Sequence, residues 1–496
     1  MDLEKSDTGE RKDTTTFHEN APADEALAQF SDAEKTKAFQ KLDWNLIPLL
    51  GVLYMLSYID RGNVGNAYTA GMGEDWGITS NQYSWIITAY YLAYIAFHWF
   101  ILLWKLVSLP VRLPPPVPHL MWVALMAFGW GAASILQAAT VNFAGLVALR
   151  CLIGVFEAGF APGVALFLSF FYHRSEMGFR YGLFISFSPI ANCFASALAY
   201  GIVHANSSLT KWQLLFIIEG IPTILIAPLA YFFLPKGPGE CGFLTNRENE
   251  IVRLRALSAR GHEEKGKLNF KQVFAAFYDY KNYLQAVIIF CLNAAFAALP
   301  AFLPTIIQDI GYSSIQAQGL SAPPYLVSYF VCLAASFLSD RAGNRSYFLS
   351  TLSTVGAVGY LVQALVKGGG VRYFATYLVC GGVFPAVALT FTWVTDNQGS
   401  ASKRGAGLVI FGMVGQTGSI AGSRFFPKEE GPFYIKGMAI SAGLLFFAAI
   451  LAQVLRMLLN LENKRRDHVH GPVRSTDMSD DVVNAGDEHP NYRFIL

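Results

Sequence analysis

The chain has 496 residues, of which 53% are hydrophobic and only 15% are charged. Soluble proteins carry about 25% charged residues, so this composition excludes a string of soluble domains. The formal net charge of +2 says little about partners, and we expect no nucleic-acid partner. The apolar residues fall in blocks of about 20, the length of helix that crosses roughly 30 Å of hydrocarbon, without the alternation typical of a transmembrane barrel. The composition therefore predicts an all-α polytopic membrane protein.

Residues 1–43 form a polar segment ahead of the first apolar block. The segment carries more acidic than basic side chains and is too polar to bury a core, so we expect a disordered cytoplasmic tail. Ser31 and Glu34 have the spacing of a capping box, and good helix formers continue from Asp32 to Leu42. This pattern predicts one short helix on the membrane surface near the end of the tail.

Twelve apolar blocks follow the tail, in two sets of six. The predicted spans are 45–66, 82–104, 119–138, 142–165, 179–203, 212–234, 283–304, 322–339, 346–366, 371–394, 405–424 and 436–459. They predict two six-helix bundles, 44–234 and 283–460, joined by a polar cytoplasmic connector, 235–282, and followed by a cytoplasmic tail, 461–496.

The basic residues of the loops predict the orientation in the membrane. One side holds Lys105, Arg112, Arg174, Arg180, the cluster in the connector, Arg341, Arg345, Lys403 and Arg404, whereas the other side holds few basic residues. The positive-inside rule therefore places both termini in the cytoplasm. We expect a multi-pass protein of the plasma membrane that acts as a monomer.

Asp60 and Arg61 lie together near the end of the first span. Adjacent residues of a helix project about 100° apart, so the two side chains do not face each other. One interpretation is a pair that reaches the outer membrane surface. The small residues that follow, from Gly62 to Ala67, favour a second interpretation, in which both charges point into the bundle.

Arg150 and Glu157 lie seven residues apart in the fourth span, so they face nearly the same way, about 10 Å apart along the helix axis. Charges at this depth cost roughly 2.5–3.5 kcal/mol each and persist where they handle an ion or a charged solute. An arginine holds a carboxylate through two hydrogen bonds, and burial favours the protonated form of a glutamate. The pair therefore predicts an anion site with a proton-binding group, and the alternative is a structural ion pair with a neighbouring helix.

A charged sequence between the eighth and ninth spans includes Asp340, Arg341 and Arg345. At the junction of two helices the aspartate can cap a helix, and the arginines can pair across the bundle. We interpret these three residues as a gate and not as a substrate site.

Several weaker candidates lie elsewhere. Glu219, near the start of the sixth span, is either a cavity residue or an interfacial carboxylate tied to a basic residue, and we favour the second. In the second half Asn293, Thr390, Trp393 and Gln416 are polar or aromatic residues that can line a cavity, although a buried amide equally bonds a neighbouring helix.

The sequence predicts neither a metal site nor a cofactor. Five of the six cysteines lie in apolar blocks, and none forms a CxxC pair. Walker, HExxH and nucleophile-elbow motifs are missing, so neither ATP-driven transport nor catalysis is expected.

Three motifs resemble those of the anion:cation symporter family within the major facilitator superfamily, and in particular the fungal allantoate, nicotinate and pantothenate permeases. They are Asp60-Arg61-Gly62-Asn63, the run from Arg150 to Gly163, and the run from Phe216 to Pro222; Pro490 to Phe494 is similar as well. The resemblance implies proton-coupled uptake of a small organic anion by alternating access between two six-helix bundles. It also implies that Asp60 and Glu157 carry protons, while Arg61 and Arg150 engage the substrate carboxylate.

Two features depart from that family. A proline-rich stretch, 108–118, stands where relatives pass quickly into the third helix, and is interpreted either as a tolerated loop insertion or as retained intronic sequence. His98 stands where relatives often have a glutamate, and its role stays open.

The leading hypothesis is a proton-coupled symporter that imports a small carboxylate, such as a vitamin or a nitrogen source. The substrate-binding candidates are Arg61, Arg150, Asn293, Trp393 and Gln416. The alternative is a nutrient sensor on the same scaffold that binds but does not transport. A membrane-embedded enzyme is a remote third possibility because no nucleophile or metal cluster is present.

Overall fold

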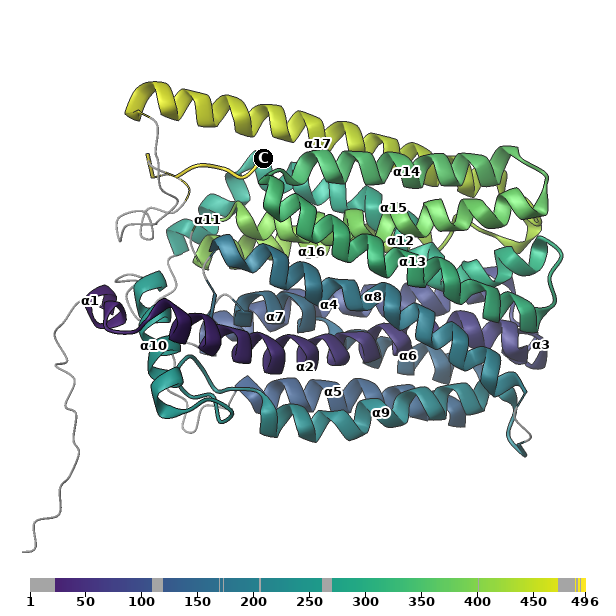
Figure 1. Cartoon of the computed structure of the whole chain (residues 1–496). Helices are drawn as coiled ribbons and strands as arrows, with labels where there is room; N and C mark the ends of the chain where they lie inside the picture. Colours follow the sequence, from purple (N-terminus) through teal and green to yellow (C-terminus); the bar gives the residue numbers. More distant parts are fainter. Residues whose placement is uncertain are drawn as a thin grey trace, which may run out of the picture.

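The computed structural model describes residues 23–108, 119–168, 170–172, 174–204, 207–260, 270–399, 401–471, 487, 489–490 and 492–496. Long helices lie side by side along one axis, and the described residues contain no strand. The start of the first long helix and the end of the last one lie at the same end of this bundle (Figure 1). We call that end the terminus side. The predicted all-α fold is confirmed.

The helices of the first half are α1 (Ala23–Ala28), α2 (Asp32–Ala67), α3 (Gly73–Asp75), α4 (Ser80–Ser108), α5 (His119–Leu136), α6 (Phe143–Glu157), α7 (Phe160–Leu168), α8 (Arg174–Val203) and α9 (Lys211–Phe233). The connector and second half contain α10 (Asn246–Arg260), α11 (Phe270–Tyr278), α12 (Tyr280–Asp309), α13 (Ser314–Ala342), α14 (Arg345–Leu365), α15 (Gly369–Asp396), α16 (Ala401–Gly422) and α17 (Ile435–His470).

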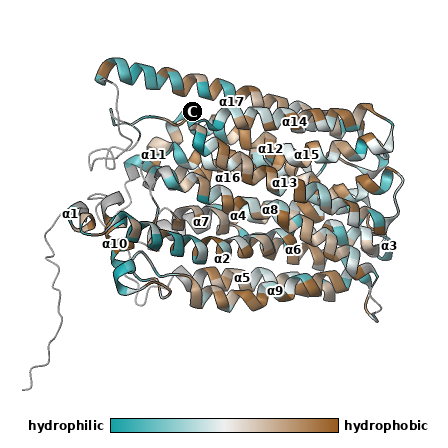
Figure 2. Ribbon diagram, viewed as in Figure 1, coloured by the Kyte–Doolittle hydropathy of each residue, from teal (hydrophilic) through white to brown (hydrophobic). Residues whose placement is uncertain are grey.

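The helices account for all twelve predicted spans. Among the described residues, eight helices are long and apolar enough to cross a membrane, and the bent helix α12 makes a ninth. The spans predicted at 82–104, 119–138 and 142–165 correspond to α4, to α5, and to α6 with α7. Apolar colour predominates in the bundle in Figure 2, whereas hydrophilic residues gather at α10 and the end of α17.

The surface helix predicted for Asp32 to Leu42 is instead the beginning of α2, which runs without a break for 36 residues. Its predicted capping box is present, because Ser31 accepts from the Glu34 amide and the Glu34 carboxylate accepts from the Ser31 amide. The residues between the capping box and the apolar block are mostly good helix formers, such as alanine, lysine and glutamine, so the helix continues into the block. Within 1–43, expected to be disordered, residues 23–43 are thus largely helical, and 1–22 lie outside the described residues.

The fourth span is broken directly after Glu157, one of the predicted site residues. α6 ends at Glu157 and α7 begins at Phe160. The sequence explains the break, since a proline at position 162 has no amide hydrogen to donate to the carbonyl four residues earlier, at Ala158. The last residue of α6 is therefore held at a break in the middle of the bundle.

The two halves touch on the terminus side through α8 and α13 and on the opposite side through α2, α4, α12 and α13. On the terminus side, a Cβ added to Gly182 would lie 2.6 Å from the Ser336 hydroxyl oxygen. On the opposite side, the Tyr83 hydroxyl donates to the Ala301 carbonyl at 2.9 Å. The central region is therefore bracketed by contacts between the halves on both sides.

The connector is more ordered than a simple tether. α10 packs on α1 and α2, where Glu248 pairs with Lys41 at 2.7 Å, and α11 packs on α16. Arg255 of α10 also pairs with Glu176 of α8. The described part of the predicted polar loop is thus largely helical, and its charged side chains have partners on both bundles.

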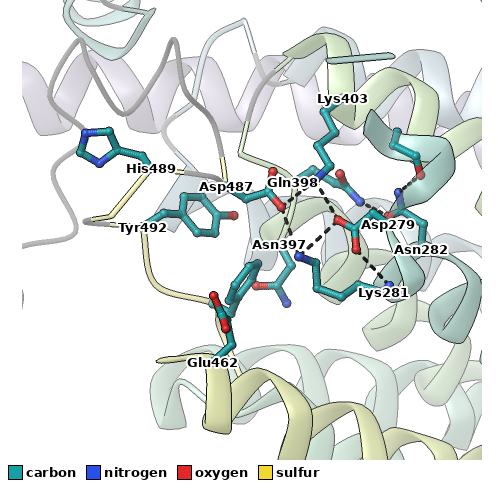
Figure 3. A network of polar contacts seen from close by, with 12 residues as sticks. Asp279, Lys281, Asn282, Asn397, Gln398, Lys403, Glu462, Asp487, His489 and Tyr492 are labelled. Atoms are coloured by element: carbon teal, nitrogen blue, oxygen red, sulfur yellow. Dashed lines mark hydrogen bonds and ion pairs between the residues drawn. The ribbon is translucent and has the colours of Figure 1, made fainter. Parts of the chain in front are cut away.

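The predicted cytoplasmic tail, 461–496, also differs from a free tail. α17 continues to His470, and Tyr492 and Phe494 are buried against the end of the second bundle. Nearby, Lys403 pairs with Asp279 and Asp487 at 2.7 Å each (Figure 3). Burial opposes ionisation of Asp279, but Lys281 and Lys403 hold its pKa below the usual value.

Candidate functional site

Arg61 and Glu157 form an ion pair at the centre of the first half. The Arg61 Nη2 atom lies 2.7 Å from Oε2 of Glu157, and the Tyr90 hydroxyl donates to the same oxygen at 2.6 Å. The ring of Tyr58 lies 4.5 Å from the guanidinium carbon of Arg61, and the Tyr90 ring lies 5.1 Å from it. Three different helices thus hold this cation by one carboxylate and several aromatic faces.

Arg150 lies beside this pair without a carboxylate partner. Its Nη1 donates to the backbone carbonyls of Asp60 and Arg61 at 3.2 and 3.3 Å. Its Nε and Nη2 are buried and have no hydrogen-bond partner within the described part of the chain. Two guanidinium nitrogens of Arg150 can therefore donate to an anion, although only 1% of the residue is exposed.

Asp60 is completely buried, so the interpretation of a pair at the membrane surface is excluded. Its two carboxylate oxygens accept from the hydroxyls of Ser134 at 2.5 Å and Thr223 at 2.9 Å. As the spacing predicted, Asp60 and its neighbour Arg61 have different partners. A hydroxyl can donate to an ionised carboxylate and can accept from a protonated carboxyl group. Asp60 can therefore take up a proton and keep both hydrogen-bond partners.

A cavity of two lobes lies between the halves. The first lobe is lined by Tyr58, Arg61, Gly62, Val64, Ile86, Ile87, Tyr90, Tyr91, Arg150, Phe296, Ala297, Pro300 and Ala301. The second is lined by Tyr54, Tyr58, Arg61, Tyr91, Tyr94, Ala161, Asn293, Phe296, Val387, Phe391, Gln416 and Ser419. Each lobe leaves about 30 Å³ for the centres of water molecules, which is room for a few waters.

Arg61 belongs to both lobes, so it marks the middle of the cavity. Asn293 and Gln416 line the second lobe from α12 and α16, as expected from the sequence. The rest of the second lobe is largely aromatic, whereas the first lobe has four aromatic rings among mainly aliphatic residues. This combination of cations, amides and flat rings fits a small planar anion.

Trp393 does not lie in this cavity. Its indole nitrogen donates to the Ile495 carbonyl at 2.8 Å, and the residue is fully buried near the end of α15. The proposed substrate contact is therefore not supported, because the carboxyl-terminal segment occupies the position that a solute would need. Thr390 also turns away, since its hydroxyl donates to the Ala386 carbonyl of its own helix.

The residues predicted to form a gate lie on the terminus side. Arg345 pairs with Asp340 at 2.6 Å and with Asp396 at 3.2 Å, and a Cβ on Gly178 of α8 would overlap its guanidinium. Arg341 is exposed, and the described structure brings only Asp340 and Arg345 of the three predicted residues together. Asp340 does not cap a helix: it lies within α13, which ends at Gly343 with φ of 63°, and Asn344 is the N-cap residue of α14.

Sequence reasoning undervalued Glu219. It is 2% exposed, and neither carboxylate oxygen has a hydrogen-bond partner within the described residues, so it is not tied to a basic residue at the interface. The signal was its spacing: Phe216 and Thr223, one turn to either side, contact Arg150 and Asp60. His98 is also buried, in the second span, where its ring stacks 5.6 Å from that of Tyr94.

Two bundles around a central cavity, with two arginines on one wall and buried carboxyl groups beside these arginines, are the arrangement of a secondary transporter. A family model described as Major Facilitator Superfamily matches residues 50–423. The chain belongs to the major facilitator superfamily and is a membrane transporter, not an enzyme.

Its relatives are fungal transporters. The major facilitator-type transporter hxnP of Emericella nidulans is 31% identical over 473 residues, which cover 94% of both chains. The high-affinity nicotinic acid transporter of Saccharomyces cerevisiae is 28% identical and aligns with 95% of this chain and 87% of its own length.

Solved structures share the fold. A bacterial homologue of the human lysosomal transporter Spinster, inward-facing and unoccupied, has a TM-score of 0.61 at 15% identity, over 87% of this chain and 99% of its own. The proton:xylose symporter XylE has a TM-score of 0.59 at 11% identity, over 89% of this chain and 99% of its own. At such identities the likeness concerns the fold alone.

Proposed function

We propose that this transporter imports a small organic anion together with a proton, by alternating access across the plasma membrane with both termini in the cytoplasm. The observation that carries the proposal is the pair of arginines, Arg61 and Arg150, which line one cavity and retain N–H groups without partners within the described residues. Guanidinium groups bind carboxylates through charge-assisted hydrogen bonds. The nicotinic acid transporter among the relatives supports a carboxylate as the substrate.

Glu157 supplies a route for coupling. Its carboxylate holds Arg61 at 2.7 Å. A bound carboxylate competes for the same guanidinium, and a proton on Glu157 removes the resulting repulsion between the two anions. Asp60, held by two hydroxyls, offers a second position for the proton. Binding of the anion and of the proton therefore favour each other, as coupled transport requires.

The aromatic lining narrows the class of substrate. Tyr58, Tyr91 and Phe296 belong to both lobes, next to Arg61. Flat rings of this kind pack best on a planar solute. A small aromatic or conjugated monocarboxylate is therefore the first substrate to try.

The experiment is uptake of radiolabelled nicotinate and of a panel of small monocarboxylates into proteoliposomes with a set pH gradient. We expect accumulation when the outside is acidic, and its loss when a protonophore collapses the gradient. Uptake that is indifferent to pH would refute the coupling. Saturable binding without accumulation would instead fit the nutrient sensor.

A further inference from the structure

Glu219 lies between two members of the charged site. Phe216, Glu219 and Thr223 are spaced by three and four residues on α9, so they share one face of that helix. The Phe216 ring is 5.9 Å from the guanidinium carbon of Arg150, and the Thr223 hydroxyl donates to Asp60 at 2.9 Å. The face that carries Glu219 is therefore the face that meets both Arg150 and Asp60.

The surroundings of Glu219 do not suit a carboxylate ion. It is 2% exposed, and both of its oxygens lack a hydrogen-bond partner within the described residues. The charged groups that act on it are Asp60 of α2 and Arg150 of α6, one of each sign. At this level α5 faces α9 with neutral residues, among them Gly131 and Ile135. An ion without partners in such a place is strongly disfavoured, whereas the protonated acid costs much less.

The charges of the site balance only if one acid is neutral. The described first half holds two guanidinium groups at the site, on Arg61 with 15% of its side chain exposed and on buried Arg150, and three buried carboxyl groups, on Asp60, Glu157 and Glu219. With all three acids ionised the site would carry one net negative charge in a medium of low dielectric constant.

We propose that Glu219 keeps a proton throughout the transport cycle and serves as a charge-balancing acid, separate from the acid that carries the transported proton. The inference deepens the proposed proton-coupled anion transport and rests on it. With Glu219 neutral the empty site has no net charge, and a bound monoanion is balanced by one proton on Asp60 or Glu157. One proton then accompanies each monoanion, and the cycle moves no net charge.

Infrared spectroscopy of the purified protein in liposomes tests the proposal directly. We expect the carbonyl band of a protonated acid in the wild type at alkaline pH and its loss in Glu219→Gln. Glu176→Gln is the matched control, because that carboxylate pairs with Arg255 and contributes no such band. Glu219→Gln should also transport with an unchanged pH profile and one proton per anion.

Asp60→Asn gives a second test should Glu219→Gln fail to fold. With Asp60 neutral, ionised Glu157 and Glu219 balance the two arginines, so the band should disappear at a lower pH than in the wild type. A wild type without the band at alkaline pH, or a changed proton stoichiometry in Glu219→Gln, would overturn the inference. Uptake that is independent of pH while the band is present would overturn the proposed function alone.

A different set of contacts carries a second inference, about the carboxyl-terminal segment. Two asparagines bind its backbone through both ends of their carboxamides. Asn397 donates to the Ile495 carbonyl at 2.9 Å and accepts from its amide at 2.8 Å. Asn463 makes the same pair of bonds with Phe494, at 2.8 and 2.9 Å. The segment is therefore recognised as an extended strand would be.

Side chains add to this attachment. The Lys281 ammonium lies 4.5 Å from the centre of the Phe494 ring, and the guanidinium carbon of Arg466 lies 5.0 Å from it. Upstream, Asp487 joins Lys403 at 2.7 Å and Lys281 at 3.4 Å (Figure 3). Helices α12, α15, α16 and α17 are thereby connected through one short segment.

The segment also touches the gate. The Leu496 carbonyl accepts from the backbone amide of Arg345, and the Tyr492 hydroxyl donates to the Asp396 carbonyl at 3.4 Å. Arg345 in turn lies against Gly178 of the other half. The geometry points to residues 492–496 as a strap that holds the Arg345 gate in place and slows the opening of the terminus side.

Hydrogen exchange of the protein in lipid nanodiscs tests the strap. Arg466 and Arg465 both pair with Glu462, but only Arg466 donates to the Tyr492 carbonyl. We expect Arg466→Gln to raise exchange at 174–182 about fivefold, for the loss of roughly 1 kcal/mol of hydrogen bonding, and Arg465→Gln to leave it unchanged. Replacing Asn397 and Asn463 together by leucine should have a larger effect. Unchanged exchange in both the Arg466 variant and the double variant would overturn the inference.

Discussion

The two halves of the transporter bury their charges in different ways. In the first half, Arg61, Arg150 and Asp60 lie in the middle of the bundle, and the arginines keep N–H groups without partners in the described structure. In the second half, the cluster around Arg345 and the cluster around Lys403 lie at helix ends, and each cation has two carboxylates.

We infer that the charged clusters of the second half stabilise the fold, whereas the arginines of the first half are arranged to bind a ligand. A buried ion pair contributes to structure only when its hydrogen-bonding groups are satisfied. Donors left over at a cavity wall cost free energy in the empty protein and recover it when an anion binds. The wall that α12 and α16 contribute is uncharged and carries Asn293, Gln416 and Ser419. The first half is therefore expected to hold the substrate, and the second half to close over it.

The strongest test of this contrast replaces one buried arginine in each half. Arg150→Ala should lower uptake at least about 100-fold, since charge-assisted hydrogen bonds contribute roughly 1.5–3 kcal/mol each. Arg372 in α15 is equally buried; its Nη2 donates to the Pro432 carbonyl, and its Nε, like that of Arg150, has no partner among the described residues, but Arg372 lines neither lobe of the cavity. Arg372→Ala should destabilise the protein without abolishing binding in the fraction that folds. Uptake per folded molecule, measured against surface expression, compares the two. Equal losses would mean that the halves do not differ in this way.

The next test concerns coupling. Glu157→Gln imitates the protonated acid, so the variant should bind and exchange the anion but lose uphill accumulation, about tenfold or more, along with its dependence on pH. An acidic outside medium should stimulate anion uptake by the wild type, because in the proposed cycle the carrier takes up a proton before it reorients inward with the bound anion. Glu248→Gln, which removes the surface partner of Lys41, is the control and should keep the wild-type pH profile. Counterflow and net uptake at several pH values separate exchange from accumulation.

Hydropathy and the rarity of buried charge were sufficient to predict the spans and to select Asp60, Arg61, Arg150 and Glu157. They were not sufficient to pair them. Arg61 and Glu157 are 96 residues apart, and their contact depends on how α2 and α6 are rotated and on the helix break after Glu157. Such rotations are set by packing between helices, which a single sequence records only weakly.

The missed features have the same origin. Trp393 reads as a cavity residue in the sequence, but the carboxyl-terminal segment returns to cover its indole. Glu219 reads as an interfacial residue, yet its neighbours on α9 turn it towards Asp60. In both cases a contact between segments distant in the sequence decides the role, whereas local pattern alone suggests another.

A milder effect is expected from the saturated charges of the second half. Asp396→Asn removes one of the two carboxylates of Arg345 and leaves Asp340 at 2.6 Å. The free energy of unfolding should fall by about 1–3 kcal/mol, while uptake by the folded protein should change by less than tenfold. Thermal unfolding in detergent and uptake at matched expression measure the two effects. A loss of uptake as large as that of Arg150→Ala would show that this cluster does more than hold the gate.

The smallest effect should come from the uncharged wall. Asn293→Ala and Gln416→Ala each remove a polar group from the second lobe, and the Gln416 side chain already accepts from the Ser419 hydroxyl at 3.1 Å. A neutral hydrogen bond contributes roughly 0.5–1.5 kcal/mol, so KM should rise by about two- to tenfold. Neither variant should change the pH profile, because neither residue carries a proton in the cycle. Initial rates over a range of anion concentrations at two pH values give both quantities. A shifted pH profile in Gln416→Ala would mean that the second half takes part in proton coupling, and the division of labour between the halves would then fail.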